Sequence, residues 1–597
     1  MQHDNWYDEE SSLGWRSKRL FIYRYISDTI WLPLLSGLTT ATSRSSVRLM
    51  FFLIFVFFGL FLSTRLLDST TTASSSATSI TRNPPGSSVL TTNTLQVEPK
   101  VISETTPKEQ NIESLHDKPD ITPVISEKTP EEQNTQTVHS EPDITQVISK
   151  SPPKKIEIPL KCSSDNLTKT CPADYYPKRF NLQDLEYTSE QPLECPEYFR
   201  WIHEDLKPWR ETGITEEMVL RAKRTANFRL VILNGRAYVE IYQKSFQSRD
   251  TFTLWGILQL LRKYPGKVPD LDLMFDCVDW PVIMKKYYRG PNAVAPPPLF
   301  RYCRDDSTLD IVFPDWSFWG WPEINIKPWG SLLKDLEEGN RRSRWVDREP
   351  HAYWKGNPVV AETRMDLLKC NVSEKEDWNA RVYAQDWIKE SQEGYKQSDL
   401  ASQCVHRYKI YIEGSAWSVS NKYILACDSV TFIVKPRYYD FFMRGLMPVH
   451  HYWPIKEDDK CRSIKFAVEW GNSHKQKAQE IGKAASSFIH DDLKMDKVYD
   501  YMLHLLTEYS KLLKYKPTIP EKAIELCSES MSCSAQGFEK EFMMESMIKG
   551  PAMVQPCTMP PAYDPSALNS LIRRKKNSVL QVEKWENGYF ENQNNKT

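Results

Sequence analysis

The stretch that decides the fold class is Tyr408-Lys-Ile-Tyr-Ile-Glu-Gly-Ser-Ala-Trp-Ser-Val-Ser-Asn-Lys-Tyr-Ile-Leu-Ala-Cys-Asp-Ser-Val-Thr-Phe-Ile-Val434. It begins and ends with short apolar runs, 408–412 and 430–434, which are typical of buried strands. Between them a Gly-Ser turn leads into a segment with helical apolar spacing, 418–427. A strand, a helix and a second strand in this order predict a βαβ unit. The chain is therefore predicted to contain an α/β domain.

The sequence upstream of this unit adds a hairpin, a helix and a further strand. Residues 228–242 form two alternating runs around Asn234-Gly235, the pattern of a tight β-hairpin. Helical spacing over 253–264 ends at Pro265-Gly266, and Leu271 to Cys277 follows as a buried strand. Because 597 residues exceed what one hydrophobic core usually organises, we expect at least two lobes.

An apolar run near the start of the chain, Leu49 to Leu62, predicts an uncleaved signal anchor over 47–67. The run is short, so a cleaved signal peptide is the alternative. About 46 residues precede it, too many for a signal-peptide n-region, and no A-x-A-like cleavage site follows.

From residue 68 to 160 the chain is rich in Ser, Thr, Pro and Glu, and residues 101–111 recur in altered form from 124. This composition predicts a disordered stem.

The twelve cysteines place the bulk of the chain in an oxidising compartment, because all of them follow the apolar run. Glycosylation sequons at Asn166, Asn371 and Asn595 lie on the same side. The final Asn-Asn-Lys-Thr lacks a retrieval signal for the endoplasmic reticulum, so a single-pass type II protein of the Golgi membrane is expected. The expected divisions are a cytosolic tail (1–46), the transmembrane signal anchor (47–67), the disordered stem with its tandem repeat (68–160), a two-lobed lumenal domain (161–548) closed by amphipathic helices over 466–513, and a polar, Pro-interrupted C-terminal tail (549–597).

Disulfide pairing stays open at this level. Cys162 and Cys171, like Cys527 and Cys533, are close enough in sequence to close small loops. Cys277 and Cys427 sit in apolar runs and are candidates for free buried thiols.

Composition narrows the classes of partner. Lys plus Arg number 77 against 78 Asp plus Glu, so the chain has none of the basic excess typical of nucleic-acid binding. The 19 Trp and 28 Tyr supply flat aromatic faces that can grip sugar rings and nucleotide bases, although each of them is more often a core residue.

Three aspartates cluster at and beyond the strand 271–277: Asp272, Asp276 and Asp279. Carboxylates at the carboxyl end of a strand lie where α/β proteins bind ligands, and one of them could act as a general base. The alternative is an Asp that caps the next turn. Asp270 and Asp272 have a D-x-D spacing that could hold a metal ion, but they fall at the beginning of the strand, so no metal site is predicted.

Three further segments could carry chemistry. Five aromatic side chains crowd into residues 313–321, which could form a sugar platform or a packed core. Residues 351–357 with Arg364 offer a glycine for close approach and cations for a diphosphate. The turn at 413–418 places backbone N–H groups at a predicted helix start, where anions bind.

Together these segments resemble glycosyltransferase family 90, the Rumi-like protein O-glucosyltransferase and capsule-associated family, and especially its plant members. The resemblance covers roughly 195–533. It is carried by Phe275-Asp-Cys-Val-Asp-Trp-Pro281, Phe313-Pro-Asp-Trp-Ser-Phe-Trp319, Tyr353-Trp-Lys-Gly356 with Arg364, and Tyr408 to Ser418 with Lys422.

The resemblance implies a GT-B-like architecture of two Rossmann-like lobes and inverting transfer from a UDP-sugar to a hydroxyl group, with no required metal or other cofactor. It implies that Asp279 is the catalytic base. The implied donor-binding residues are Gly356, Asn357, Arg364, Gly414, Ser415, Ala416, Trp417, Ser418 and Lys422. The implied acceptor-binding residues are Trp316, Ser317, Phe318 and Trp319.

Two departures from the family pattern bear on the donor sugar. Ser420 stands where Rumi-type members have an arginine, so diphosphate contact would pass to Lys422, and Asn357 stands where they have a serine. Glucose, xylose and related sugars stay open, as does the acceptor, a protein or a cell-wall glycan. The alternatives are a non-catalytic carbohydrate-binding membrane protein and a glycoside hydrolase with paired carboxylates.

Overall fold

The computed structural model describes residues 156–162, 170–176, 192–290 and 293–595. The chain divides into two compact units, Met1–His139 and Ser140–Thr597, and every described residue belongs to the second. The expected tail (1–46), anchor (47–67) and most of the stem lie outside the described residues. None of the described helices is both long and apolar enough to cross a bilayer.

The first sheet has six strands and is mixed. Its order is β11 (Ile524–Leu526), β2 (Arg236–Ile241), β1 (Phe228–Leu233), β3 (Leu271–Phe275), β4 (Leu299–Arg301) and β5 (Ile311–Val312). The predicted hairpin is confirmed: β1 and β2 pair antiparallel around Asn234 and Gly235, both at positive φ. Only β3, β4 and β5 run parallel, so this lobe is less Rossmann-like than expected. The hairpin adds antiparallel strands to β3.

The second sheet is wholly parallel and confirms the predicted βαβ unit. Its order is β10 (Trp453–Ile455), β9 (Val430–Val434), β8 (His406–Tyr411), β6 (Glu349–Gly356) and β7 (Ala380–Ala384). The connecting helix α10 (Ser420–Leu425) is shorter than the sequence indicated. Counted from β6, the strand order is 2-1-3-4-5, which is the flavodoxin-like, doubly wound arrangement.

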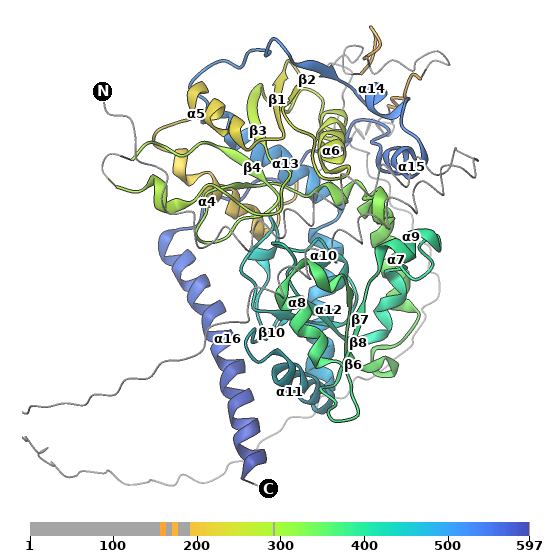
Figure 1. The fold of residues 1–597 in the computed structure, drawn as a ribbon. Coiled ribbons are helices and arrows are strands. Elements are labelled where there is room, and N and C mark those ends of the chain that lie inside the picture. The colour runs from red at the N-terminus through yellow and green to blue at the C-terminus, as the bar shows by residue number, and fades with distance from the viewer. Residues whose placement is uncertain (1–155, 163–169, 177–191, 291–292, 596–597) are drawn as a thin grey trace, which may run out of the picture. The chain divides into compact units, whose positions relative to one another are not determined.

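Helices cover both faces of the second sheet because successive side chains of its strands point in opposite directions. Tyr408 and Ile410 of β8 share a core with α11 (Lys460–Ser473), whereas Tyr411 joins a second core with Leu425 of α10. In Figure 1, α7, α8, α10, α11 and α12 gather around this sheet, and α6 and α13 lie with the first. The chain thus returns to the first lobe through α13.

The other helices complete the two lobes. They are α4 (Trp201–Asp205), α5 (Glu216–Arg221), α6 (Arg249–Lys263), α7 (Trp329–Arg341), α8 (Glu362–Leu367), α9 (Trp387–Gln392), α12 (Lys475–Ser487), α13 (Met495–Ser510), α14 (Ser528–Ser532) and α15 (Gly537–Ser546). The helices expected over 466–513 are therefore present as α11, α12 and α13.

Both ends of the predicted lumenal domain differ from the expectation. Residues 156–160, assigned to the stem, lie against the domain, where the Ile158 amide donates to the Lys549 carbonyl oxygen at 2.7 Å. The segment assigned to a polar tail contains α16 (Pro565–Asn594), a helix of 30 residues. Its buried side chain Glu586 accepts a hydrogen bond from Ser463 at 3.0 Å, so α16 is part of the fold.

The disulfides join segments far apart in the sequence. The pairs among the described residues are Cys162–Cys533, Cys171–Cys527, Cys195–Cys557, Cys370–Cys461 and Cys404–Cys427. The two small loops suggested by spacing are therefore wrong, because α14 presents its cysteines to the start of the domain. Of the two candidate free thiols, Cys277 is free and buried, whereas Cys427 is paired; Cys303 is the second free, buried cysteine of the described chain.

Candidate active site

The predicted donor residues meet at the switch point of the second sheet. β6 ends at Gly356 and β8 at Tyr411, and these neighbouring parallel strands continue to opposite sides, to β7 and β9. Doubly wound sheets bind their ligands in the crevice outside the carboxyl ends of such a strand pair. The segments that follow the two strands are 356–364 and 412–418, the same two that the sequence assigned to the donor.

Arg364, from α8, holds these two segments together. Its guanidinium donates to the carbonyl oxygens of Asn357 (3.2 Å), Ile412 (3.1 Å) and Glu413 (2.9 Å), and to Ser418 Oγ (3.1 Å). No carboxylate of the described residues forms an ion pair with it. Burial lowers the pKa of this guanidinium, which still carries a charge. The switch point therefore contains a positive charge that no described side chain neutralises.

Two glycines allow the close approach of the backbone at this point. A Cβ on Gly356 would lie 2.7 Å from Cζ2 of Trp354, and one on Gly414 would lie 3.3 Å from Nη2 of Arg364. Asn357 caps the turn after β6, since its side chain accepts from the Val359 amide at 3.0 Å. These contacts keep the segment after β6 against the sheet.

The turn from Gly414 to Ser418 is fixed by its own polar groups. The Ser418 amide donates to the Tyr411 hydroxyl at 3.1 Å, and the Gly414 amide donates to the Ala416 carbonyl oxygen at 3.0 Å. Glu413, just before the turn, accepts from the amides of residues 437 and 438. Burial raises the pKa of the Glu413 carboxyl to about 7, opposed by these amides. Gly414, Ser415 and Ser418 are partly exposed, and Ala416 and Trp417 are buried.

Lys422 lies inside the protein, not at its surface. Its ammonium group donates to Ser317 Oγ at 2.7 Å and lies 3.4 Å from Asp315 Oδ2. Burial lowers the pKa of the ammonium, and Asp315 opposes this. Because α10 begins at Ser420, Lys422 falls in its first turn on the side that packs into the core. The ammonium expected to meet the diphosphate is thus engaged by a carboxylate.

Asp279 lies beyond the carboxyl end of β3, in a loop that two arginines hold in place. Arg249 of α6 donates to its Oδ1 at 2.5 Å, and Arg301 of β4 donates to the carbonyl oxygens of Val278 and Trp280. The side chain of Asp279 is 14% exposed. The base proposed from the sequence is therefore held in place and reached by solvent.

The neighbouring aspartates are structural. Asp272 is fully buried in a pair with Arg229, and Asp276 is buried in a pair with Arg301. Burial raises the pKa of Asp276, opposed by Arg301. Asp270 accepts from the Asn234 amide in the hairpin turn at 2.7 Å. The two carboxylates of the D-x-D spacing thus serve different parts of the fold.

The predicted acceptor platform is wrong as an exposed surface. Trp316, Ser317, Phe318 and Trp319 are all buried, in the 3-10 turn that Asp315 caps. The Trp319 ring packs directly on Gly256, where an added Cβ would lie 2.4 Å from the ring. The Trp316 ring packs on Arg249, whose guanidinium lies 4.4 Å from the ring centroid. Because these side chains are buried, the alternative of a packed core is correct. The loop also packs against Arg249, the arginine that pairs with Asp279.

Cys303 and the adjacent Tyr302 connect the loop of Asp279 to the donor turn. The Cys303 thiol donates to the Asp279 carbonyl oxygen at 3.2 Å. The Trp417 ring packs on Tyr302, with centroids 5.7 Å apart. The structure therefore brings Asp279 next to the residues after β8, although more than a hundred residues separate them.

Four residues of this arrangement were missed by the sequence analysis: Arg249, Arg301, Cys303 and Trp280. The first three act through contacts between distant segments, which no spacing reveals. Trp280 follows Asp279 directly and is 40% exposed, with Val278 41% exposed on the other side. Its position next to Asp279 was the signal in the sequence that could have indicated a role for Trp280 in the site.

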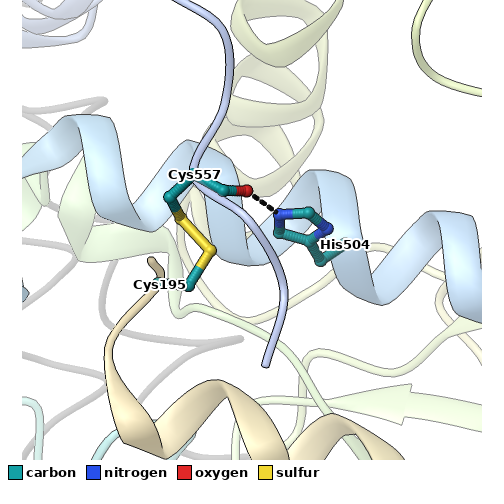
Figure 2. Close-up of side chains that lie close together, drawn as sticks. All are labelled: Cys195, His504 and Cys557. Atoms are coloured by element: carbon teal, nitrogen blue, oxygen red, sulfur yellow. Dashed lines mark hydrogen bonds between the residues drawn. A yellow bond between two sulfur atoms is a disulfide. The ribbon is translucent and has the colours of Figure 1, made fainter. Parts of the chain in front are cut away.

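One cluster of metal-ligand types, Cys195, His504 and Cys557, lies elsewhere. Figure 2 shows that the two cysteines form a disulfide and that His504 hydrogen-bonds the Cys557 carbonyl oxygen, at 2.8 Å. The thiolates that a metal would need are consumed in the disulfide.

The three predicted glycosylation sites differ in their location and exposure. Asn166 lies outside it. Asn371 is partly exposed, and its amide oxygen accepts from the Val382 amide at 3.0 Å. Asn595 is exposed at the end of α16.

Two α/β lobes, one of them built on a doubly wound sheet with a cationic switch point, fit a Rossmann-like glycosyltransferase fold. The model of the glycosyl transferase family 90 matches residues 190–586. The chain belongs to this family.

Curated relatives agree with this membership. An O-glucosyltransferase rumi homolog of Anopheles gambiae is 26% identical over 359 residues, 57% of this chain and 85% of that protein. Protein O-glucosyltransferase 1 of Homo sapiens is 27% identical over 357 residues, again 57% and 85%. O-glucosyltransferase rumi of Drosophila melanogaster is 23% identical over 359 residues, 58% and 82%.

Proposed function

We propose that the chain is an inverting glycosyltransferase that moves glucose, xylose or a related sugar from a UDP-sugar to a hydroxyl of a protein or a cell-wall glycan. The observation that carries the proposal is the proximity of Asp279 to the switch point of the second sheet, through the contact of Asp279 with Cys303 and the packing of the adjacent Tyr302 on Trp417. The relatives named above are O-glucosyltransferases, which favours glucose as the sugar and a protein as the acceptor.

In the proposed reaction, the acceptor hydroxyl attacks the anomeric carbon as Asp279 accepts its proton. The new C–O bond forms while the bond from that carbon to the diphosphate breaks, and UDP leaves with the bonding electron pair. Attack on the face opposite the leaving group inverts the anomeric centre. Asp279 is the carboxylate of its cluster that solvent reaches, whereas Asp272 and Asp276 are sealed in ion pairs.

The donor's diphosphate would lie at the switch point, against Gly356, Asn357 and the turn 414–418. Arg364 supplies a positive charge there without a carboxylate partner among the described residues. A low-dielectric surrounding strengthens such an attraction. This charge supports a mechanism that requires no metal ion. Because Lys422 is buried and paired with Asp315, it would not contact the diphosphate directly and would act on it only by long-range electrostatics.

The acceptor would approach over the exposed side chains of Val278 and Trp280, which flank Asp279. An aromatic face suits a sugar ring or a peptide, so this surface does not choose between the two acceptor classes. It replaces the buried loop 316–319 as the candidate acceptor surface.

We further propose that the enzyme works in the Golgi lumen as a single-pass type II membrane protein. The disulfides of the described chain are typical of an oxidising compartment, and the apolar run at 49–62 supplies the anchor. Protease protection in sealed microsomes tests this topology, because digestion of the C-terminal bulk without detergent would show that it faces the cytosol.

The test of the function is a donor screen of the purified protein, with UDP-glucose, UDP-xylose and other UDP-sugars offered to peptide and glycan acceptors. We expect UDP release, and an acceptor whose mass increases by one sugar residue, with one donor preferred. Glycan binding without UDP binding or transfer from any donor would instead identify a non-catalytic carbohydrate-binding protein.

Replacing Arg364 by Ala is expected to weaken UDP binding about ten- to a hundredfold, measured by calorimetry. Charge-assisted hydrogen bonds contribute about 1.5–3 kcal/mol, and the change also frees the two segments that Arg364 holds. Arg364→Lys keeps the charge but cannot span the same four acceptors, so it should also weaken binding. Arg381→Ala, which removes an arginine paired with Asp377 on the same sheet, is the control. Wild-type affinity in folded Arg364→Ala would contradict the assignment.

Replacing Arg249 by Gln is expected to lower kcat about tenfold or more while KM for the donor stays unchanged. Arg249 positions Asp279 and touches no proposed donor residue. Arg249→Lys retains a cation and should recover part of the rate. A rise in donor KM with unchanged kcat would place Arg249 in donor binding instead.

A further inference from the structure

The C-terminal helix α16 forms one wall of a hollow that the proposed reaction does not use. The hollow has a volume of about 490 Å³, within the range of about 300–1,000 Å³ typical of small-ligand sites. Val449, in the loop before β10, is its one lining residue outside α16. None of the proposed donor or acceptor residues lines it.

The lining side chains of α16 recur every three or four residues and so form one face of the helix. They include Arg573, Arg574, Asn577, Gln581 and Trp585. The neighbouring face is fixed to the second lobe, because Val582 and Glu586 are buried there and Lys456 lies 3.3 Å from Glu586. The hollow therefore has a rigid wall on its helical side.

Arg573 and Arg574 give the hollow a positive charge. Neither forms an ion pair with a carboxylate of the described chain, and both are exposed. Lys575, between them and Lys576, donates to the Arg444 carbonyl oxygen. Burial lowers the pKa of the Lys575 ammonium to about 8, and the positive charges of Arg444 and Arg574 add to this effect. A guanidinium group binds a planar carboxylate in a bidentate manner.

Trp585 supplies a fixed aromatic face beside these arginines. Its ring lies nearly parallel to that of Trp470, at 10° and 6.3 Å between centroids, and packs on Trp453 at 6.1 Å. Two tryptophans thus hold its orientation while 40% of the residue stays exposed. Aromatic faces pack on the apolar face of a sugar ring, and amide side chains such as Asn577 and Gln581 bind its hydroxyls.

We propose that this hollow is a second binding site for an acidic glycan, one whose sugars carry carboxylates. The arginines bind the carboxylates, Trp585 packs on a ring, and the amides bind hydroxyl groups. An anionic lipid headgroup shares the negative charge, but it offers no ring for the tryptophan. The proposal stands independently of the glycosyl transfer proposed above.

The test is binding of a fluorescent oligosaccharide of galacturonic acid to the full-length, detergent-solubilised protein, followed by anisotropy at low salt. We expect binding at least tenfold tighter than that of a neutral cello-oligosaccharide of the same length, and weaker binding as salt rises. Asp279→Asn and excess UDP should leave the affinity unchanged, because the hollow shares no residue with the proposed active site.

The double change Arg573→Ala and Arg574→Ala should weaken binding of this probe about tenfold or more, and Trp585→Ala should also weaken it. Lys584→Ala, on the same helix but outside the lining, is the matched control and should bind as the wild type does. Equal affinity for acidic and neutral oligosaccharides, unchanged affinity in the double variant, or displacement of the probe by phosphatidylserine vesicles would each overturn the proposal.

Discussion

Replacing Asp279 by Asn is expected to reduce sugar transfer by about 10²–10⁴ while UDP binding stays at the wild-type level. A sugar or serine hydroxyl is a weak nucleophile at neutral pH, so its proton must be removed as the new bond forms. Asparagine keeps the shape of the side chain and can still accept from Arg249, but it cannot take the proton. The loss should therefore appear in kcat, because the base contacts the acceptor and not the nucleotide.

Single-turnover kinetics with labelled donor, together with calorimetric UDP binding, measures the two quantities separately. Asp270→Asn is the matched control, because it makes the same chemical change at the opposite end of β3, where the carboxylate accepts from the Asn234 amide. Full activity in folded Asp279→Asn would remove the proposed base. Lost UDP binding would instead place Asp279 in the donor site.

The elements that the sequence predicted well are those whose signals are local. The hairpin around Asn234-Gly235 depends on two adjacent residues that accept positive φ, and its alternating strands extend directly from them. The unit from β8 to β9 follows from apolar runs separated by a turn and a helix. Because the ends of β6 and β8 lie side by side, the two local motifs predicted to bind the donor come together at the switch point.

The features that could not be predicted depend on contacts between distant segments. A loop rich in tryptophan has the same composition whether it forms a sugar platform or a core. Only the position of Gly256 against Trp319 and of Arg249 against Trp316 shows that loop 316–319 is a core. Cysteine spacing likewise gave no information on Cys195–Cys557, whose partners are 362 residues apart. α16 was not predicted because its polar composition resembles a tail, and its buried contacts come from β10, α11 and the segment between them.

The second large effect is expected at Lys422, whose ammonium lies buried beside Asp315. Replacing Lys422 by Met should lower the free energy of unfolding by about 3–5 kcal/mol, because Asp315 is then left as a buried charge without its partner. Chemical denaturation followed by tryptophan fluorescence measures this loss. Lys477→Met removes a lysine that is 64% exposed and paired with Glu480, so it should change stability by less than about 1 kcal/mol.

A second substitution separates the lost ion pair from lost packing. Adding Asp315→Asn to Lys422→Met removes the unpaired charge, and asparagine can still accept from the Ser317 amide that Asp315 now binds at 2.9 Å. The double variant should therefore recover most of the stability lost in Lys422→Met, since a buried ion pair can often be replaced by neutral groups at little cost. No recovery would show that the packing of the Lys422 side chain, whose Nζ lies 4.7 Å from the centroid of the Phe318 ring, matters more than its ion pair with Asp315. If the recovered variant also binds UDP normally, the lysine maintains the turn before α10 and does not itself neutralise the diphosphate.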